Sequence, residues 1–227
     1  MTTALDARRR RRRPNPLILA VAAGKGGVGK TTSALYIATQ AARLLGGTTD
    51  DPAVGIIDRD ESRNLTKRLR LEPDLLRPGT IFLPGEELPP ADCGLDLVVL
   101  DTPPGHLSLD SLRQAQLVVV PVLPETNGVI TLTEYLDNLE LHRIAVSPDM
   151  RLVALLPTML MRTLTHSQRL EDIRAIAAHH RPPLTMLTPV PRRTRIEGLD
   201  LDAPEYAAPA KELFAHAGIA TASARAD

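Results

Sequence analysis

The stretch Gly24-Lys25-Gly26-Gly27-Val28-Gly29-Lys30-Thr31 decides the fold of this chain, because it satisfies the phosphate-loop pattern G-x-x-x-x-G-K-[ST]. Glycines let the backbone N–H groups of such a loop converge on phosphate oxygens, an approach that side chains would block. Lys30 is expected to bring its charge to the β- and γ-phosphates, and the Thr31 hydroxyl can complete a Mg²⁺ shell. The stretch therefore predicts a nucleotide site.

The segments on either side of the loop are typical of a strand and a helix. Residues 17–22, LILAVA, form an apolar run that suits a buried parallel strand, and residues 33–38, SALYIA, suit the first turns of a helix. This strand–loop–helix order is the context that the phosphate-loop pattern requires.

The rest of the chain alternates between apolar runs and segments with helical periodicity. This alternation predicts an α/β fold with a doubly wound, mainly parallel sheet that binds ligands at the carboxyl ends of its strands. We expect a disordered basic arm at 1–15, a phosphate-loop domain at 16–218 and a flexible tail at 219–227. The proline-rich stretch 70–92 is expected to form surface loops around one short strand. The further predicted strands are 54–58, 80–83, 95–101, 117–122 and 152–156, and the further predicted helices are 130–144, 170–177 and 205–217.

Composition narrows the classes of function. The formal net charge is zero, but residues 8–13 are six consecutive arginines and leave the remaining chain net acidic. Any affinity for nucleic acid must therefore come from local patches. Cys93 is the single cysteine, which excludes an internal disulfide and a thiolate cluster within one chain. No apolar run approaches the roughly 20 residues that cross a bilayer, and no signal peptide is recognisable, so we expect a cytoplasmic protein.

Three acidic residues lie at the ends of predicted strands. Asp58 ends the strand 54–58 with Asp60 just beyond it, and Asp101 ends the strand 95–101. The carboxyl ends of parallel strands meet at the edge of the sheet where the phosphate loop also lies. Carboxylates there can orient a water, and an acid in the position of Asp101 holds the Mg²⁺ of phosphate-loop NTPases. Together with the loop, these acids predict a site for phosphoryl transfer.

The motifs of this chain resemble those of the ParA/MinD superfamily of partitioning and positioning ATPases, and most of all a compact ParA-type partition ATPase. Residues 25–32, KGGVGKTT, resemble the deviant Walker A motif of that superfamily. Residues 58–60, DRD, resemble its second motif, and residues 101–105, DTPPG, its Walker B. Weaker similarity continues through residues 64–66, 120–124, 155–159 and 190–192.

The resemblance implies a role for each matched residue, with ATP and Mg²⁺ as cofactors. Lys25 would reach across a dimer interface to the phosphates of the ATP bound by the partner, so that dimerisation depends on nucleotide. Asp60 would help to position the attacking water, and Asp58 would support the network of Mg²⁺ and water. The implied catalytic residues are Lys25, Asp58 and Asp60, and the implied metal-site residues are Thr31, Asp58 and Asp101. The implied nucleotide-binding residues are Gly24, Lys25, Gly26, Gly27, Val28, Gly29, Lys30, Thr31 and Thr32.

The chain also departs from the pattern of the superfamily. The usual Asp-Pro-Gln is replaced by Asp60-Glu61-Ser62, a change that bears on turnover more than on binding. About forty residues separate Asp60 from Asp101, as in the compact plasmid-type members. No helix-turn-helix domain is recognisable before the loop, so operator recognition by this chain alone is not expected.

Members of the superfamily bind DNA non-specifically as ATP dimers, through basic residues near their carboxyl end. The arginine arm 8–13 is either a second candidate for this contact, because clustered arginines bind polyanions at low salt, or a solubilising tail. The patch that the resemblance implies consists of Arg192, Arg193 and Arg195, with Arg162, Arg169 and Arg181 as candidate neighbours.

The sequence leaves three hypotheses for the function. The first is a slow ATPase that associates with the nucleoid, is stimulated by a ParB-like or cargo-adaptor partner, and drives chromosome or plasmid partition or cargo positioning. The second is a MinD-like ATPase of the membrane surface, but residues 218–225 do not provide the basic amphipathic helix that it needs. The third is a non-hydrolysing, ATP-switched DNA-binding scaffold, if Glu61 and Ser62 disturb the positioning of water. A nitrogenase-like reductase would need cluster cysteines, and a bacterial tyrosine kinase a tyrosine-rich tail; the chain has neither.

Overall fold

A seven-stranded sheet in the order β3-β2-β4-β1-β5-β6-β7 forms the centre of the molecule, and every neighbouring pair of strands is parallel. The computed structural model describes residues 15–105, 111–147, 149–193 and 203–224, without the side chains of Val146 and Leu152. The predicted α/β class with a parallel sheet is confirmed. The strands are β1 (Leu17–Val21), β2 (Val54–Asp58), β3 (Thr80–Phe82), β4 (Leu97–Asp101), β5 (Leu117–Val122), β6 (Leu152–Pro157) and β7 (Thr185–Met186).

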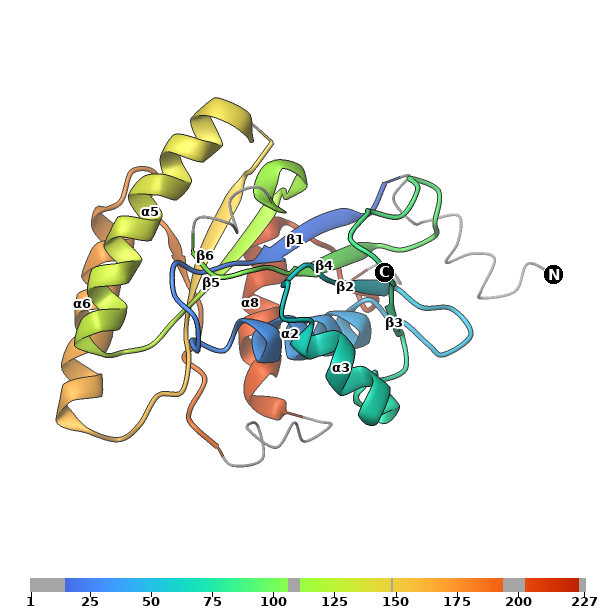
Figure 1. The fold of residues 1–227 in the computed structure, drawn as a ribbon, viewed down its shortest axis with the longest axis horizontal. Coiled ribbons are helices and arrows are strands. Elements are labelled where there is room, and N and C mark those ends of the chain that lie inside the picture. The colour runs from blue at the N-terminus through green and yellow to red at the C-terminus, as the bar shows by residue number, and fades with distance from the viewer. Residues whose placement is uncertain (1–14, 106–110, 148, 194–202, 225–227) are drawn as a thin grey trace.

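Helices cover both faces of this sheet, as its continuously apolar strands require (Figure 1). One face packs against α2 (Lys30–Leu44), α3 (Asn64–Leu71) and α8 (Ala207–Ala217). The other face packs against α5 (Thr126–Val146) and α6 (Leu164–His179). The apolar core is thereby divided into two layers, one on each side of the sheet. Short 3-10 helices lie at Pro73–Leu75, Leu112–Gln114 and Pro204–Tyr206.

The register of the central strands brings the phosphate loop and two of the predicted acids to one edge. Val21, the last residue of β1, pairs with Asp101 of β4, and Asp101 pairs in turn with Asp58 of β2. The loop that leaves β1 therefore starts beside Asp101, with Asp58 one strand further away. This geometry is the one expected from the carboxyl ends of parallel strands.

The short strand expected among the loops at 70–92 is present as β3, which pairs in parallel with β2 at the edge of the sheet. The helix α3 was not predicted at all. Its buried face consists of Leu65 and Leu69, and one such pair is too short a pattern to indicate a helix by periodicity.

The two ends of the chain can be compared with their predictions only in part. The arm at 1–15, including the arginines 8–13, lies outside the described residues except for its last residue. At the other end, Gly218 ends α8 with a φ of 63° and turns the chain back. Ile219 is buried in the core, and the N–H of Ala222 donates to the Leu44 carbonyl at 2.7 Å. The segment 219–222 thus packs on the domain, whereas a flexible tail was expected there. Within the described residues, no helix combines the length and the apolar character needed to span a membrane.

Candidate nucleotide site

The phosphate loop has an open, glycine-lined cradle at the amino end of α2. Gly27 and Gly29 have φ values of 75° and 87°, in the left-handed region that glycine adopts without strain. A Cβ added at Gly26 or Gly27 would meet no atom within 4 Å, so the space above this backbone is free. Gly29 caps α2 without a side-chain hydrogen bond, which leaves the N–H groups of the first turn for an anion. The cradle fits the phosphates of a nucleotide.

Contacts from three other parts of the sheet edge hold this loop in place. The Thr158 hydroxyl, just after β6, donates to the Val28 carbonyl at 2.8 Å. The N–H of Gly105 donates to the Ala23 carbonyl at 3.0 Å. Gly24 lies so close to α5 that an added Cβ would be 2.9 Å from the Cβ of Tyr135. Sequence reasoning did not select Thr158 as a site residue, although a hydroxyl directly after a buried strand at this edge was a usable signal.

The Asp101 carboxyl group is buried and forms no hydrogen bond with the described residues, which leaves both of its oxygens available to a metal ion. Neither of its oxygens has a hydrogen-bond partner in the described part of the chain. Burial raises the pKa of Asp101 to about 7, while the nearby Thr31 side chain and Lys30 oppose this shift. Mg²⁺ prefers oxygen ligands and retains several waters. The carboxylate of Asp101 and the hydroxyl of Thr31 are therefore a donor set that fits Mg²⁺, and their assignment to the ion stays a prediction.

Lys30 lies among these acids. Its side chain is buried, and burial lowers the pKa of Lys30, whereas the charges of Asp101 and Asp60 raise it. Each of the two acids therefore interacts with the same ammonium group. A positive charge held in this way at the foot of the cradle suits the binding of nucleotide phosphates.

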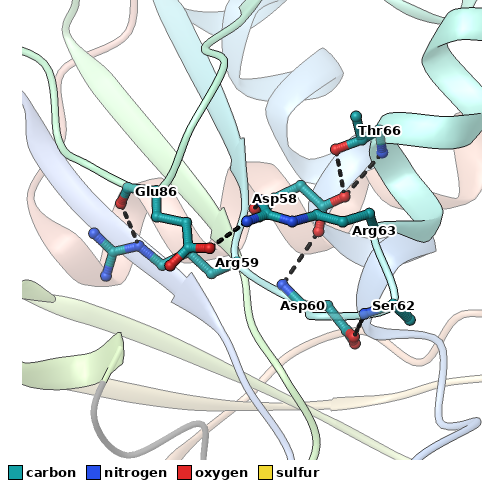
Figure 2. A network of polar contacts seen from close by, with 7 residues as sticks. All are labelled: Asp58, Arg59, Asp60, Ser62, Arg63, Thr66 and Glu86. Carbon is teal, nitrogen blue, oxygen red and sulfur yellow. Dashed lines mark hydrogen bonds and ion pairs between the residues drawn. The ribbon is translucent and has the colours of Figure 1, made fainter.

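Asp58 has a structural role that sequence reasoning did not foresee. Its Oδ2 accepts hydrogen bonds from the N–H and the hydroxyl of Thr66 at 2.8 and 2.7 Å, and its Oδ1 accepts one from the N–H of Asp60 at 3.2 Å (Figure 2). Thr66 lies in the first turn of α3, whose N-cap residue makes no side-chain cap of its own. Asp58 thus caps α3 from the neighbouring strand. Its assignment to the Mg²⁺ network stays a prediction.

Asp60 lies two residues beyond the end of β2 and is held by a tight turn. Its Oδ1 accepts a hydrogen bond from the N–H of Ser62 at 2.9 Å (Figure 2). Its side chain is half-buried and close enough to Lys30 to raise the pKa of that lysine. The second carboxylate oxygen of Asp60 can still accept a proton or a hydrogen bond from a water.

Arg59 lies between the two acids in sequence but points away from the cradle. Its guanidinium donates to the Glu86 carbonyl at 2.9 Å, to the Gln114 side chain at 3.1 Å and to the Ser111 carbonyl at 3.4 Å. Burial lowers the pKa of Arg59 and the charge of Glu86 opposes this shift. Arg59 therefore ties the turn of Asp58 and Asp60 to two neighbouring loops. The sequence contained no signal for this role.

A small pocket adjoins the loop on the side away from the acids. It opens beside Gly29 and Thr32. Tyr206 lies in this wall, its ring tilted by 36° to that of Tyr36 with 5.2 Å between the ring centroids, and its hydroxyl is 3.1 Å from the Ser33 hydroxyl. The pocket is lined by Gly29, Thr32, Thr158, Met159, Val190, Pro191, Arg192, Arg193 and Tyr206.

The basic residues proposed as a DNA patch do not all gather in one place. Arg192 and Arg193 are exposed and share a groove with Arg162. Arg169 instead pairs with Asp172 at 2.7 Å on the same helix.

Two further candidates do not join that group. Arg181 lies beyond the far end of α6, where its guanidinium donates to backbone carbonyls such as that of His180 at 3.1 Å. The 16 residues of α6 separate it from Arg162 by about 24 Å at roughly 1.5 Å per residue. The expectation that Arg181 adjoins the patch is therefore wrong, because a whole helix lies between them. Arg195 lies outside the described residues.

Sequence comparison decides the family. No protein-family model matches the sequence. The chain is, however, 31% identical to the chromosome-partitioning ATPase Soj of Thermus thermophilus, in an alignment that covers 78% of this chain and 82% of that protein. The chain belongs to the ParA/MinD superfamily of P-loop ATPases. The membership that the motifs indicated is thereby confirmed.

Solved structures of similar fold include proteins with nucleotide bound. The ATP complex of a McdA variant from Cyanothece aligns with a TM-score of 0.71 at 18% identity, over 90% of this chain and 97% of McdA, a likeness that shows the shared fold. The cobyrinic acid a,c-diamide synthase of Mycobacterium smegmatis, with bound ADP and magnesium, aligns with a TM-score of 0.65 at 26% identity, over 89% of this chain and 96% of that protein. Nucleotide and Mg²⁺ binding thus occurs among proteins of this architecture.

Proposed function

We propose that this chain is a ParA-type ATPase that dimerises on ATP, binds DNA non-specifically as a dimer and positions DNA or another cargo. The observation that carries the proposal is the contrast between the two lysines of the phosphate loop. Lys30 is buried among the acids, whereas Lys25 is exposed and forms no ion pair with a residue that the structure describes. An exposed lysine at this point is free to reach a phosphate bound in a second copy, which is the electrostatic role of an arginine finger in other NTPases.

In the proposed cycle, Mg²⁺ supplies charge neutralisation at the phosphates. The cradle and Lys30 hold the phosphates, Thr31 and Asp101 hold the ion, and Asp60 orients the attacking water. The description of Soj as a chromosome-partitioning ATPase supports a role in partition for this chain. The same relationship supports a nucleoid-associated, cytoplasmic protein whose slow turnover is stimulated by a ParB-like or cargo-adaptor partner.

Replacement of Lys25 tests the proposed dimer. Lys25→Ala should still bind ATP, because the cradle and Lys30 remain, but should lose the ATP-dependent shift from monomer to dimer in light scattering. Lys211→Ala removes an equally exposed lysine from α8 and should dimerise like the unaltered protein. If Lys25→Ala dimerises normally with ATP, Lys25 is not needed for the dimer and the proposal loses its support.

Charge reversal tests the proposed DNA contact. Arg192→Glu combined with Arg195→Glu should abolish salt-sensitive retention of duplex DNA, because each neutralised phosphate contributes about 0.9 to the slope of log K against log salt. ATP affinity must be measured in parallel, since Arg192 also lines the pocket beside Gly29. If DNA retention survives this change and disappears on deletion of residues 1–13, the arginine arm is the contact.

Two features separate the partition ATPase from the two alternative hypotheses: the structure of the segment after α8 and the presence of ATP turnover. A membrane-surface ATPase would need an amphipathic segment after α8, but Ile219 packs into the core and Ala222 bonds back to α2. A non-hydrolysing scaffold is favoured only if turnover is absent even with DNA and a stimulating partner. Phosphate release should therefore be measured with DNA alone, with the product of an adjacent gene alone and with both. Stimulation by both together selects the partition class.

A further inference from the structure

A second concave surface lies outside the nucleotide site, between α3 and the edge strand β3. It is an open groove of about 700 Å³, and β3 forms the outer margin of the sheet, so no further strand of the described residues covers it. We name this surface the α3–β3 groove. Its lining residues are Arg63, Thr66, Lys67, Leu69, Arg70, Pro73, Leu76, Phe82, Pro84 and Gly85.

The charge of the α3–β3 groove has one sign. Arg63, Lys67 and Arg70 supply three cations, and no lining residue is acidic. Lys67 and Arg70 are exposed and have no ion-pair partner in the part of the chain that the structure describes. Arg63, at the inner end, is paired with the carboxylate of Glu86 from the adjacent loop (Figure 2). That pair shows that the rim accepts a carboxylate.

The floor of the groove is apolar, which separates the possible occupants. Leu76 and Phe82, which line the groove, are only partly buried. A nucleic acid strand would satisfy the cations with phosphates but would leave this floor uncovered. The arginine arm 8–13 of the same chain would be repelled by the rim. An acidic polypeptide segment with a large apolar side chain complements both the rim and the floor.

The groove is joined to the nucleotide site by direct contacts. Thr66, which lines the groove, donates both of its hydrogen bonds to the Asp58 carboxylate. Arg63 donates to the Asp58 carbonyl as well as to Glu86. Glu86 is 64% exposed on its side chain and can be displaced into solvent. A carboxylate that replaces Glu86 on Arg63 would therefore act on the turn that carries Asp58 and Asp60.

We propose that the α3–β3 groove is the docking site for an acidic, apolar segment of a protein partner, and that its occupation changes the rate of ATP turnover. The second part rests on the proposed function; the docking does not. The charges of Lys67 and Arg70 attract the acidic segment, and the apolar floor binds its large apolar side chain. A carboxylate of the segment replaces Glu86 on Arg63, and this replacement acts on Asp58.

A binding measurement with the full chain tests the docking. The probe is a short fluorescein-labelled peptide of alternating Glu and Leu, followed by fluorescence anisotropy without nucleotide. Lys67→Glu with Arg70→Glu should weaken its binding by roughly tenfold or more, because two rim charges become repulsive. Arg68→Glu is the matched control, since Arg68 lies on the same helix but does not line the groove. Glu86→Gln should tighten binding, because it removes the internal competitor for Arg63.

The specificity of the probe decides the chemistry of the partner. A peptide with Ser in place of Leu and one with Lys in place of Glu should both bind poorly. The docking is overturned if the Glu–Leu peptide does not bind, if Arg68→Glu weakens binding as much as the groove variant, or if single-stranded oligothymidylate binds the groove better than the peptide.

ATP turnover is measured separately from peptide binding, so that the docking and its effect on turnover are tested independently. The peptide should change phosphate release by the unaltered protein, and it should not do so for Lys67→Glu with Arg70→Glu, whose basal turnover is unchanged. Bound peptide without any effect on turnover would overturn the coupling. If the unaltered protein shows no DNA retention or no ATP-dependent dimerisation, the proposed function is refuted and the docking is unaffected.

Discussion

Asp60→Ala should lower ATP turnover by roughly 10²–10⁴-fold, the contribution of a positioned general base, while ATP binding and DNA binding persist. The reason lies in its position: Asp60 is held by the N–H of Ser62 at 2.9 Å and interacts with Lys30, but takes no part in the cradle. Single-turnover phosphate release measures the chemical step, and a fluorescent ATP analogue measures the affinity. DNA retention with ATP should be preserved or prolonged.

Asp92→Ala is the matched control for this change, because it removes an exposed aspartate from the segment before β4, away from the phosphate loop. Its turnover should equal that of the unaltered protein. Turnover that is unchanged in Asp60→Ala would withdraw Asp60 from the role of orienting the water. If the unaltered protein itself releases no phosphate with DNA and a partner present, the non-hydrolysing scaffold becomes the better description.

Asp101→Asn should change how the stability of the nucleotide-free protein depends on pH. Burial raises the pKa of Asp101 from 3.8 to about 7, so the folded state binds this proton more tightly than the unfolded state. The free energy of unfolding therefore falls as the pH rises from the unfolded pKa to the folded one. At about 1.4 kcal/mol per pKa unit, the loss approaches roughly 4 kcal/mol. Asparagine does not titrate, so the Asp101→Asn variant should not lose this free energy of unfolding as the pH rises.

Urea unfolding at several pH values between about 5 and 8 checks this prediction. The difference in unfolding free energy between Asp101→Asn and the unaltered protein should shift in favour of the variant as the pH rises. The test is the slope of this difference against pH, because the buried amide of the variant changes the unfolding free energy by an amount that does not depend on pH. Asp92→Asn alters an exposed acid and should run parallel to the unaltered protein. Parallel curves for Asp101→Asn would show that Asp101 is not the titrating group.

The fold and the cradle could be predicted because their signals are local. The glycines and Lys30 stand within one loop, and the apolar runs beside it mark buried strands without reference to the rest of the chain. Asp101 was found because it ends such a run, and parallel strands bring their carboxyl ends together. These features need only the strand periodicity and the direction of the sheet.

The contacts that link distant segments could not be predicted in the same way. Thr158 reaches Val28 across the sheet edge, and Arg59 reaches Gln114; both depend on the strand order, which no local pattern encodes. The expectation for Arg181 was wrong for a related reason, since Arg181 and Arg162 lie beyond opposite ends of α6. Helix α3 was missed because its stability comes from Asp58 and from the core and not from its own pattern.

The bonds between Asp58 and Thr66 also affect how mutational data on this site are to be interpreted. Removing the Asp58 carboxylate breaks three hydrogen bonds to a charged group, two from Thr66 and one from the N–H of Asp60, each worth about 1.5–3 kcal/mol, and it uncaps α3 at the same time. An alanine scan would therefore score Asp58 as essential even if it never touches a phosphate, a metal ion or a water. Loss of activity at Asp58 reports on folding and chemistry together, and only a neighbour with no such anchoring duty separates the two.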